Sequence, residues 1–373
     1  MYTEVHLQYY LKEVGMSKAK VAVITDKLKI EMKALPIPEI GDKDLLVKVE
    51  MCGVCGSDLH IYQGDWGEPY PLIPGHEFIG RVEALGSNAS LIHNVNLGDR
   101  VAVEMILPCG ECYSCRSGLY NLCEKDRDEG RQYGCNISSN REGTLFGGWS
   151  EYLYVPKNAL VHRIPEHVPL KRAVLTEPLA VAVRAVNNTK PNLGDSIVIV
   201  GAGPIGLLTV VAAKSAGAYP IILVGSREER LSLGKEFGAD YVIDYRSENV
   251  LEGVLSITQG RGANIVFETA GTPKAQRDSM DYARVGGKVN FVGLTGNKTV
   301  QIETDLQMTF KELKVYTSFL SAWSYQGAIN IIANGQFPIE KMITHEFSLD
   351  EVELALSYSA NRTENAIKVA IKI

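Results

Sequence analysis

The sequence lacks the features of several protein classes. No run of about 18 or more apolar residues suggests a membrane span. The stretch Met1–Lys20 has neither the basic start nor the apolar core of a signal peptide, so we expect a cytoplasmic protein. No internal repeat or low-complexity segment is visible. Basic residues (38) are fewer than acidic residues (44), and the net charge of −6 argues against binding a polyanion. We therefore expect no membrane and no nucleic acid among the partners.

The composition is that of an ordinary globular protein. The length of 373 residues suggests about two domains. Hydrophobic residues make up 45% of the chain and charged residues 22%, which is typical of soluble proteins. The 7 cysteines are an odd number, and four of them lie within Cys109–Cys123. In a chain without an export signal, this distribution favours metal binding in a reducing compartment over a disulfide framework.

The N-terminal half reads as a β-rich domain. An extension precedes Lys20, with a short helix expected over residues 7–14. Short runs rich in β-branched residues follow, separated by Pro, Gly, Asn and Asp. The predicted strands are Ala19–Thr25, Lys27–Lys33, Asp44–Cys52, Glu77–Leu85 and Asp99–Val103.

From Arg172 onward, strands alternate with helices. The predicted strands are Ser196–Val200, Ile221–Val224, Tyr241–Ile243, Asn264–Glu268, Lys288–Val292 and Lys314–Ser318. Pro204–Ser215, Glu228–Phe237 and Lys274–Val285 are predicted helices between them. This alternation predicts a doubly wound parallel sheet. The chain ends with a predicted helix over Asp350–Ala360 and a strand over Ala366–Ile373.

The stretch Cys52–Glu77 concentrates groups that bind metals. These groups are Cys52, Cys55, Ser57, Asp58, His60, His76 and Glu77. Thiolate, imidazole and carboxylate together suit Zn²⁺. Cys55 and His76, completed by a carboxylate and water, describe an open catalytic site. The Cys52–Cys55 pair could instead be a redox motif, but that motif belongs at a helix start after a βαβ strand. Cys52 is then a buried thiol, and Cys135 has no assigned role.

A second group of cysteines has the spacing of a closed metal site. Four thiolates at short spacing can complete a tetrahedral shell around Zn²⁺, with no position left for chemistry. They are Cys109, Cys112, Cys115 and Cys123. An iron–sulfur cluster is the alternative, but its usual runs are spaced differently. We expect a structural zinc site here.

A glycine-rich turn follows the strand Ser196–Val200. Its sequence is GxGxxG, at the mouth of a predicted helix, which is the context of a dinucleotide-binding turn. The predicted cofactor-binding residues are Gly201, Gly203, Pro204, Ile205, Gly206, Ser226, Arg227 and Arg230. No Asp or Glu stands at the end of the next strand, where an acid would bind the ribose of NAD. Ser226 and Arg227 leave room and charge for a 2′-phosphate, so NADP is favoured over NAD.

Together these motifs resemble the zinc-dependent medium-chain alcohol and polyol dehydrogenases, in particular the sorbitol and threonine dehydrogenase-like branch. The resemblance rests on Cys55–His60, Gly75–Glu77, Cys109–Cys123, Thr176–Leu179 and Gly201–Gly206. It implies a GroES-like β-barrel catalytic domain with an inserted Rossmann domain. The implied boundaries are 1–178 for the catalytic domain, with the zinc lobe near 108–124, then 179–318 for the Rossmann domain. Residues 319–373 complete the catalytic domain.

The resemblance also implies roles for individual residues. Cys55 and His76 match zinc ligands, and Glu77 and Glu177 both match the position of a third ligand, without a choice between them. Ser57 matches the hydroxyl that takes the substrate proton, and His60 a relay to solvent. Asp58 resembles an acceptor that orients a ligand. The alternatives are a helix N-cap for Ser57, a surface histidine for His60 and a helix-start carboxylate for Glu177.

The sequence thus predicts a zinc-dependent oxidoreductase that transfers hydride between a secondary alcohol and NAD(P), giving the ketone. The short loop Gly64–Gly67 and two acids at the metal favour a polyol or sugar-like substrate, with Tyr62, Trp66 and Trp149 as pocket candidates. The alternatives are L-threonine 3-dehydrogenase, 2,3-butanediol dehydrogenase, a zinc-free quinone reductase of the same fold, and a non-enzymatic zinc protein that senses nucleotide. The resemblance also implies a homodimer or homotetramer, with Lys314–Ser318 as a candidate pairing edge.

Overall fold

The computed structural model describes residues 17–67, 69–141, 145–296 and 298–373, which fold into two compact units. The first unit contains the chain up to Glu177 and the segment Glu340–Ile373. The second contains Pro178–Ile339. The helix predicted over residues 7–14 lies outside the described residues. Among the described residues, no helix combines the length and the apolar character that crossing a bilayer would require.

The first unit is built mainly from strands, as predicted. Its strands are β1 (Lys18–Asp26), β2 (Lys29–Pro36), β3 (Leu45–Val54), β4 (Glu77–Leu85), β5 (Arg100–Val103), β6 (Tyr152–Val155), β7 (Val161–Arg163), β14 (Ile343–Ser348) and β15 (Lys368–Lys372). Its helices are α2 (Gly56–Gln63), α3 (Ala89–His93), α4 (Tyr113–Arg116), α5 (Asp126–Glu129), α6 (Leu170–Ala173) and α13 (Val352–Asn361).

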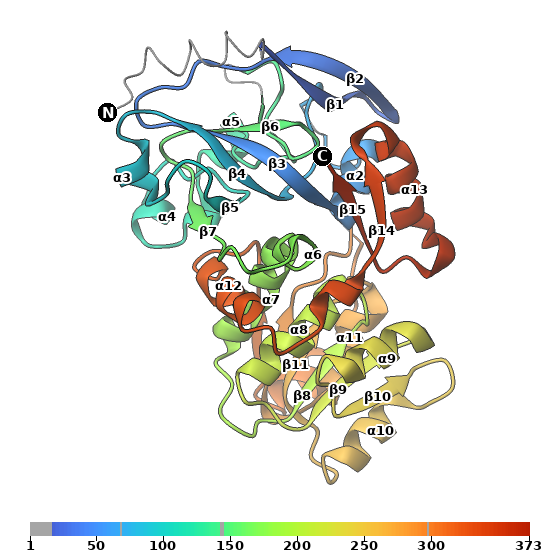
Figure 1. Ribbon diagram of the computed structural model, residues 1–373. Coiled ribbons are helices and arrows are strands. Elements are labelled where there is room, and N and C mark those ends of the chain that lie inside the picture. The colour runs from blue at the N-terminus through green and yellow to red at the C-terminus, as the bar shows by residue number, and fades with distance from the viewer. Residues whose placement is uncertain (1–16, 68, 142–144, 297) are drawn as a thin grey trace. The chain divides into compact units, whose positions relative to one another are not determined.

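Strand β3 is the centre of the main sheet in this unit. The strand order is β14-β15-β3-β4-β5-β7, and β6 also pairs with β3. Most side chains of β3 are buried, so the strand lies within the core. The C-terminal strand β15 runs antiparallel to β3 with Ala370 opposite Gly53, and Figure 1 shows the red β15 beside the blue β3. The last residues of the chain are therefore part of the same sheet as residues near position 50.

The second unit is a doubly wound α/β domain. Its strands are β8 (Ile197–Val200), β9 (Ile221–Gly225), β10 (Tyr241–Asp244), β11 (Ala263–Glu268), β12 (Ala283–Phe291) and β13 (Lys314–Thr317). Its helices are α8 (Pro204–Ser215), α9 (Glu228–Glu236), α10 (Val250–Ile257), α11 (Pro273–Tyr282) and α12 (Tyr325–Asn334), and α7 (Thr176–Thr189) leads into the unit.

The sheet of the second unit is entirely parallel, with strand order β10-β9-β8-β11-β12-β13. Strands β8 and β9 are buried along their whole length, which agrees with their continuous apolar sequences. The order reverses between β8 and β11, and ligands of such sheets bind at that reversal. The parallel sheet predicted from the sequence is confirmed, and the turn Gly201–Gly206 follows β8 at the reversal.

Two segments differ from the sequence-based expectation. Residues 319–339 pack with the second unit, whereas the sequence grouped them with the C-terminal segment. Arg184 of α7 donates a hydrogen bond to the Ala322 carbonyl at 2.9 Å, which helps to hold this segment there. The helix predicted over Lys274–Val285 ends at Tyr282, because β12 begins at Ala283 opposite Ala263 before a register shift.

Candidate active site

The sheet of the first unit brings three candidate metal ligands together. Cys55 follows β3 directly, and His76 precedes β4, whose first residue is Glu77. Since Gly53 pairs with Glu77 across the antiparallel β3–β4 ladder, the end of β3 meets the start of β4. One ligand atom from each of Cys55, His76 and Glu77 lies within 4.8 Å of the other two. A thiol, an imidazole and a carboxylate at this spacing fit Zn²⁺ with one position left open.

Asp58 connects the two loops that carry these ligands. Its Oδ2 accepts a hydrogen bond from the Cys55 amide at 2.8 Å, and its Oδ1 accepts one from the Gly75 amide at 3.3 Å. Gly75 has φ of +86°, and a Cβ at this position would lie 2.4 Å from the Trp149 ring. The sequence placed Trp149 in the substrate pocket, but it is fully buried in the core against Gly75.

Lys368, to which no sequence motif points, completes the charge balance of the site. The Lys368 ammonium forms an ion pair with Glu77, and both side chains are buried. Glu77 lies on β4 and Lys368 on β15, and these two strands flank β3. The ion pair crosses β3 at Gly53, because a Cβ on Gly53 would lie only 2.2 Å from Glu77 Oε2. Burial opposes the charge on Lys368, but Glu77 and the other acidic groups outweigh it and raise the pKa of Lys368.

Glu177 is the second candidate carboxylate. It lies in the first turn of α7 and is buried, with 6% of its surface exposed. Burial, with repulsion from Glu77, raises the pKa of Glu177 to about 7, although His76 and Lys368 act in the opposite direction. Of the two glutamates, Glu77 is the one whose oxygen lies in the ligand group with Cys55 and His76.

The two predicted proton-transfer residues have different surroundings. Ser57 Oγ lies 3.5 Å from Nε2 of the metal-ligand candidate His76. The N-cap of α2 is Cys55, so Ser57 lies inside the first turn and is not the cap residue. His60, in the last turn of α2, pairs through Nδ1 with Asp65 at 2.8 Å, and its ring stacks on Trp66. Its role as a relay stays a prediction.

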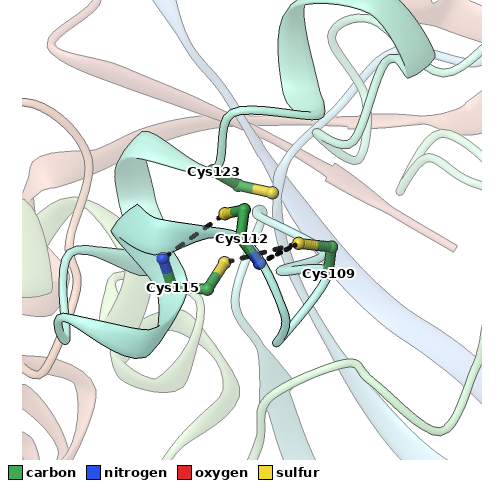
Figure 2. Close-up of side chains that lie close together, drawn as sticks. All are labelled: Cys109, Cys112, Cys115 and Cys123. Atoms are coloured by element: carbon green, nitrogen blue, oxygen red, sulfur yellow. Dashed lines mark hydrogen bonds between the residues drawn. The ribbon is translucent and has the colours of Figure 1, made fainter.

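The four-cysteine group forms a second cluster. Figure 2 shows the four cysteine side chains close together, and their sulfurs lie within 4.8 Å of one another. The Cys112 amide donates to Cys109 Sγ at 3.3 Å, and the Cys115 amide to Cys112 Sγ at 3.4 Å. Cys109 and Cys115 Sγ atoms are 3.9 Å apart, which is too long for a disulfide. The geometry fits a closed tetrahedral zinc site.

A buried carboxylate anchors this lobe. Glu104, at the end of β5, accepts hydrogen bonds from the Tyr120 hydroxyl at 2.9 and 3.0 Å. Nε2 of His162 lies 2.9 Å from Glu104 Oε1. The sequence did not point to these residues, because a single Glu after an apolar strand has no distinctive spacing.

The Cys52–Cys55 pair is not arranged as a redox motif. Cys52 is fully buried in the core, where its sulfur packs against Gly75 and Gly148. A Cβ added to either glycine would lie only 2.8 Å from this sulfur. Cys55 instead belongs to the ligand group. The expectation that Cys52 is a buried thiol behind the site is confirmed.

The glycines of the second unit adopt the geometry of a dinucleotide-binding turn. Gly201 has φ of +111°, and a Cβ there would lie 2.9 Å from the Ala270 amide nitrogen. At Gly206 a Cβ would lie 1.8 Å from the Gly201 carbonyl, so helix and strand can approach closely only without a side chain. Gly203 is the N-cap of α8, Pro204 follows at its first turn, and the space beside Gly203 is open. An anion can therefore approach the α8 amides here.

A cavity of about 550 Å³ lies beside this turn. Gly201, Ala270 and Tyr245 are among its lining residues. Gly225 ends β9, and a Cβ there would lie 2.7 Å from the Ala202 side chain, so this position has no room for an acid. The Tyr245 amide donates to the Gly225 carbonyl at 3.1 Å, which places Tyr245 beside the end of β9. No sequence motif points to Tyr245, since only the β9–β10 pairing brings it to this position.

Comparisons with known proteins agree with this geometry. Residues 41–166 match the alcohol dehydrogenase GroES-like domain, and residues 204–334 match the zinc-binding dehydrogenase family. Sorbitol dehydrogenase from Bacillus subtilis is 32% identical over 94% of this chain and 96% of its own length. L-threonine 3-dehydrogenase from Pyrococcus furiosus is 34% identical over 89% of this chain and 92% of its own length.

Solved structures are similar over nearly the whole chain. A putative zinc-binding dehydrogenase from Sinorhizobium meliloti bound to NADP has a TM-score of 0.86 and 32% identity, covering 96% of this chain and 100% of that one. An Escherichia coli alcohol dehydrogenase (rspB) complexed with NADH has a TM-score of 0.82 and 30% identity, and the match covers 96% of this chain and 100% of that one.

Fold, metal ligands and nucleotide turn together define a zinc-dependent dehydrogenase that uses NAD(P). The chain belongs to the zinc-containing medium-chain alcohol dehydrogenase family and acts on CH–OH groups of alcohols or polyols. The predicted family and the GroES-like and Rossmann fold class are confirmed. The alternative of a non-enzymatic zinc protein is thereby excluded.

We expect the two zinc sites to respond differently to loss of a ligand. Cys55→Ser should remove about one zinc per chain and abolish turnover, because the open site loses a thiolate. Cys112→Ser should mainly lower thermal stability, because its site is closed. Zinc content and initial rates measured on both variants will test this. Full activity of Cys55→Ser would exclude the catalytic zinc site.

Replacing Lys368 by Met should destabilise the protein by about 3 kcal/mol, because it leaves the buried Glu77 carboxylate without its partner. Urea unfolding of zinc-loaded protein measures the loss. The double variant Lys368→Met/Glu77→Gln should lose less than the sum of the two single variants. Strictly additive losses would show that the two side chains do not stabilise each other.

Proposed function

We propose that this enzyme oxidises a secondary alcohol group of a polyol or sugar-like compound to a ketone, with NADP as the preferred hydride acceptor. The observation that carries the proposal is the group formed by the half-buried Cys55 and the buried His76 and Glu77, with the Ser57 hydroxyl beside His76. Carboxyl groups of Glu77 and Glu177 make the site strongly polar, which suits a substrate with several hydroxyls. The similarity to sorbitol dehydrogenases supports this substrate class.

The chain's own residues define the proton path and the charge balance. A zinc ion held by Cys55, His76 and a glutamate would act as a Lewis acid and lower the pKa of the substrate alcohol. Ser57, whose Oγ lies 3.5 Å from Nε2 of His76, is proposed to accept the substrate proton. His60 is proposed to pass the proton to solvent, and Asp65 orients its imidazole through Nδ1. Lys368 offsets part of the negative charge of the site.

The end of β9 supports the preference for NADP. Gly225 leaves no space for the acid that would bind the ribose hydroxyls of NAD, and Ser226 and Arg227 follow it. The guanidinium of Arg227 and the hydroxyls of Ser226 and Tyr245 are suited to a 2′-phosphate. Arg230, one turn further along α9, is the remaining basic residue proposed for this site.

Pairing between copies of the chain is proposed to use the edge of the parallel sheet. Strand β13 is the terminal strand of that sheet, and its side chains are mostly exposed. Large apolar side chains of the same unit are also exposed, among them Val285, Phe310 and Val315. An open strand edge with exposed apolar side chains is a typical pairing surface, which supports a homodimer or homotetramer.

The substrate proposal predicts the outcome of a rate panel. Sorbitol and related polyols should give reduced nicotinamide faster than threonine or 2,3-butanediol. A zinc chelator should stop the reaction, because the catalytic site loses its metal. Threonine is the second candidate, since threonine 3-dehydrogenases are similarly close in sequence. A chelator-sensitive rate on threonine alone would transfer the assignment to that substrate. Chelator-resistant turnover of any of these substrates would contradict zinc catalysis.

The cofactor proposal predicts a selective effect at Arg227. Arg227→Ala should raise the KM for NADP⁺ about 10-fold or more, because a charge-assisted hydrogen bond is lost, and should hardly change the KM for NAD⁺. Lys235→Ala removes the same charge at the other end of α9 and is the matched control. An equal effect of Arg227→Ala on both cofactors would remove Arg227 from phosphate recognition.

A further inference from the structure

Cys135, which belongs to no sequence motif, lies beside the metal-ligand candidate His76. Its Sγ is 3.6 Å from Nδ1 of the imidazole. The neighbouring Gly134 has φ of +67° and packs on Gly75, where a Cβ of Gly134 would lie 2.3 Å from the Gly75 carbonyl oxygen. Only glycine permits this contact, and it holds the Cys135 loop against the residue that precedes His76.

The two ring nitrogens of His76 face different groups. Nε2 lies on the side of Ser57 Oγ, at 3.5 Å. Nδ1 faces Cys135 Sγ at 3.6 Å and Asp58 Oδ1 at 3.8 Å. A histidine that binds zinc through one nitrogen carries its proton on the other, and that N–H requires an acceptor.

Asp58 is poorly placed to be that acceptor. The distance of 3.8 Å from its Oδ1 to Nδ1 exceeds the range of an N–H···O hydrogen bond. Backbone amide hydrogen bonds from Gly75 and from Cys55 to its two carboxylate oxygens hold Asp58 in this place. Sulfur is larger than oxygen and accepts hydrogen bonds at longer distances, so 3.6 Å is a bonding distance for Cys135.

We propose that Cys135 is a positioning residue for the catalytic metal site: its sulfur accepts the Nδ1–H of His76 and so directs the Nε2 lone pair toward the metal. A thiol replaces the carboxylate or carbonyl that usually orients a metal-binding histidine. The proposal rests on the catalytic zinc site but not on the identity of the substrate or the nicotinamide cofactor.

The surroundings of Cys135 suit an uncharged acceptor. It packs against a small apolar cluster of Ile24, Ile61 and Leu72. Apolar neighbours favour a neutral side chain, and Cys135 places one beside the His76 imidazole.

The test compares Cys135→Ala, Cys135→Val and Cys135→Ser as full-length, zinc-loaded proteins. Alanine and valine both remove the acceptor, and valine keeps the volume, whereas serine keeps a lone pair. We expect alanine and valine to speed zinc transfer from the catalytic site to an excess of chelator by about 10-fold, and serine to have a smaller effect. Zinc release from the four-cysteine site should be unchanged and is the internal control for folding.

A spectroscopic measurement separates orientation from packing. In ¹⁵N-histidine NMR of the wild type, His76 should show a protonated Nδ1 whose hydrogen exchanges slowly with solvent, and in the alanine and valine variants this exchange should be faster. The proposal would be overturned if zinc transfer and Nδ1 hydrogen exchange kept their wild-type rates in both variants. It would also be overturned if Cys135→Ala changed these rates and Cys135→Val did not, because the effect would then come from lost volume. Wild-type protein that holds a single zinc per chain would overturn it together with the catalytic zinc site.

Discussion

The antiparallel pairing of β3 with its two neighbours at Gly53 is the constraint on which the active site depends. On one side Gly53 lies opposite Glu77, and on the other it lies opposite Ala370. This register places Cys55, His76 and Glu77 where β3 ends and β4 begins, and it brings Lys368 to the same place from the end of the chain. A shift by one residue would turn the Glu77 and Lys368 side chains to the opposite face.

The absence of a side chain at Gly53 is part of the same constraint. The Glu77–Lys368 pair occupies the space that a Cβ would need, so a buried carboxylate can cross β3 to reach a buried ammonium. A charge that is buried without a partner is costly. The pair therefore gives each of the two buried groups a partner of opposite charge, in a part of the core where Asp58 and Glu177 are also buried.

The local motifs made most of the chemistry predictable. The spacing of Cys109–Cys123 indicates a closed zinc site because its ligands lie on one short excursion of the chain. The turn Gly201–Gly206 indicates a nucleotide site because its glycines lie within one continuous strand–turn–helix segment, which the sequence shows directly. The alternation of apolar runs with helices identified the parallel sheet for the same reason. Trp149 was placed wrongly, since its aromatic ring carries no sign of whether it lies in a pocket or in the core.

The sequence by itself determined the class of chemistry: two kinds of zinc ligand set, a dinucleotide turn and the alternating elements of the second unit. The tertiary structure decided which distant residues serve those groups. Lys368 reaches Glu77, and Cys135 reaches His76, through strand register and through the contact between Gly134 and Gly75. Ligand spacing and periodicity are properties of neighbouring residues. The partner of a buried charge or of a ring nitrogen is set by chain packing, and no local pattern records it.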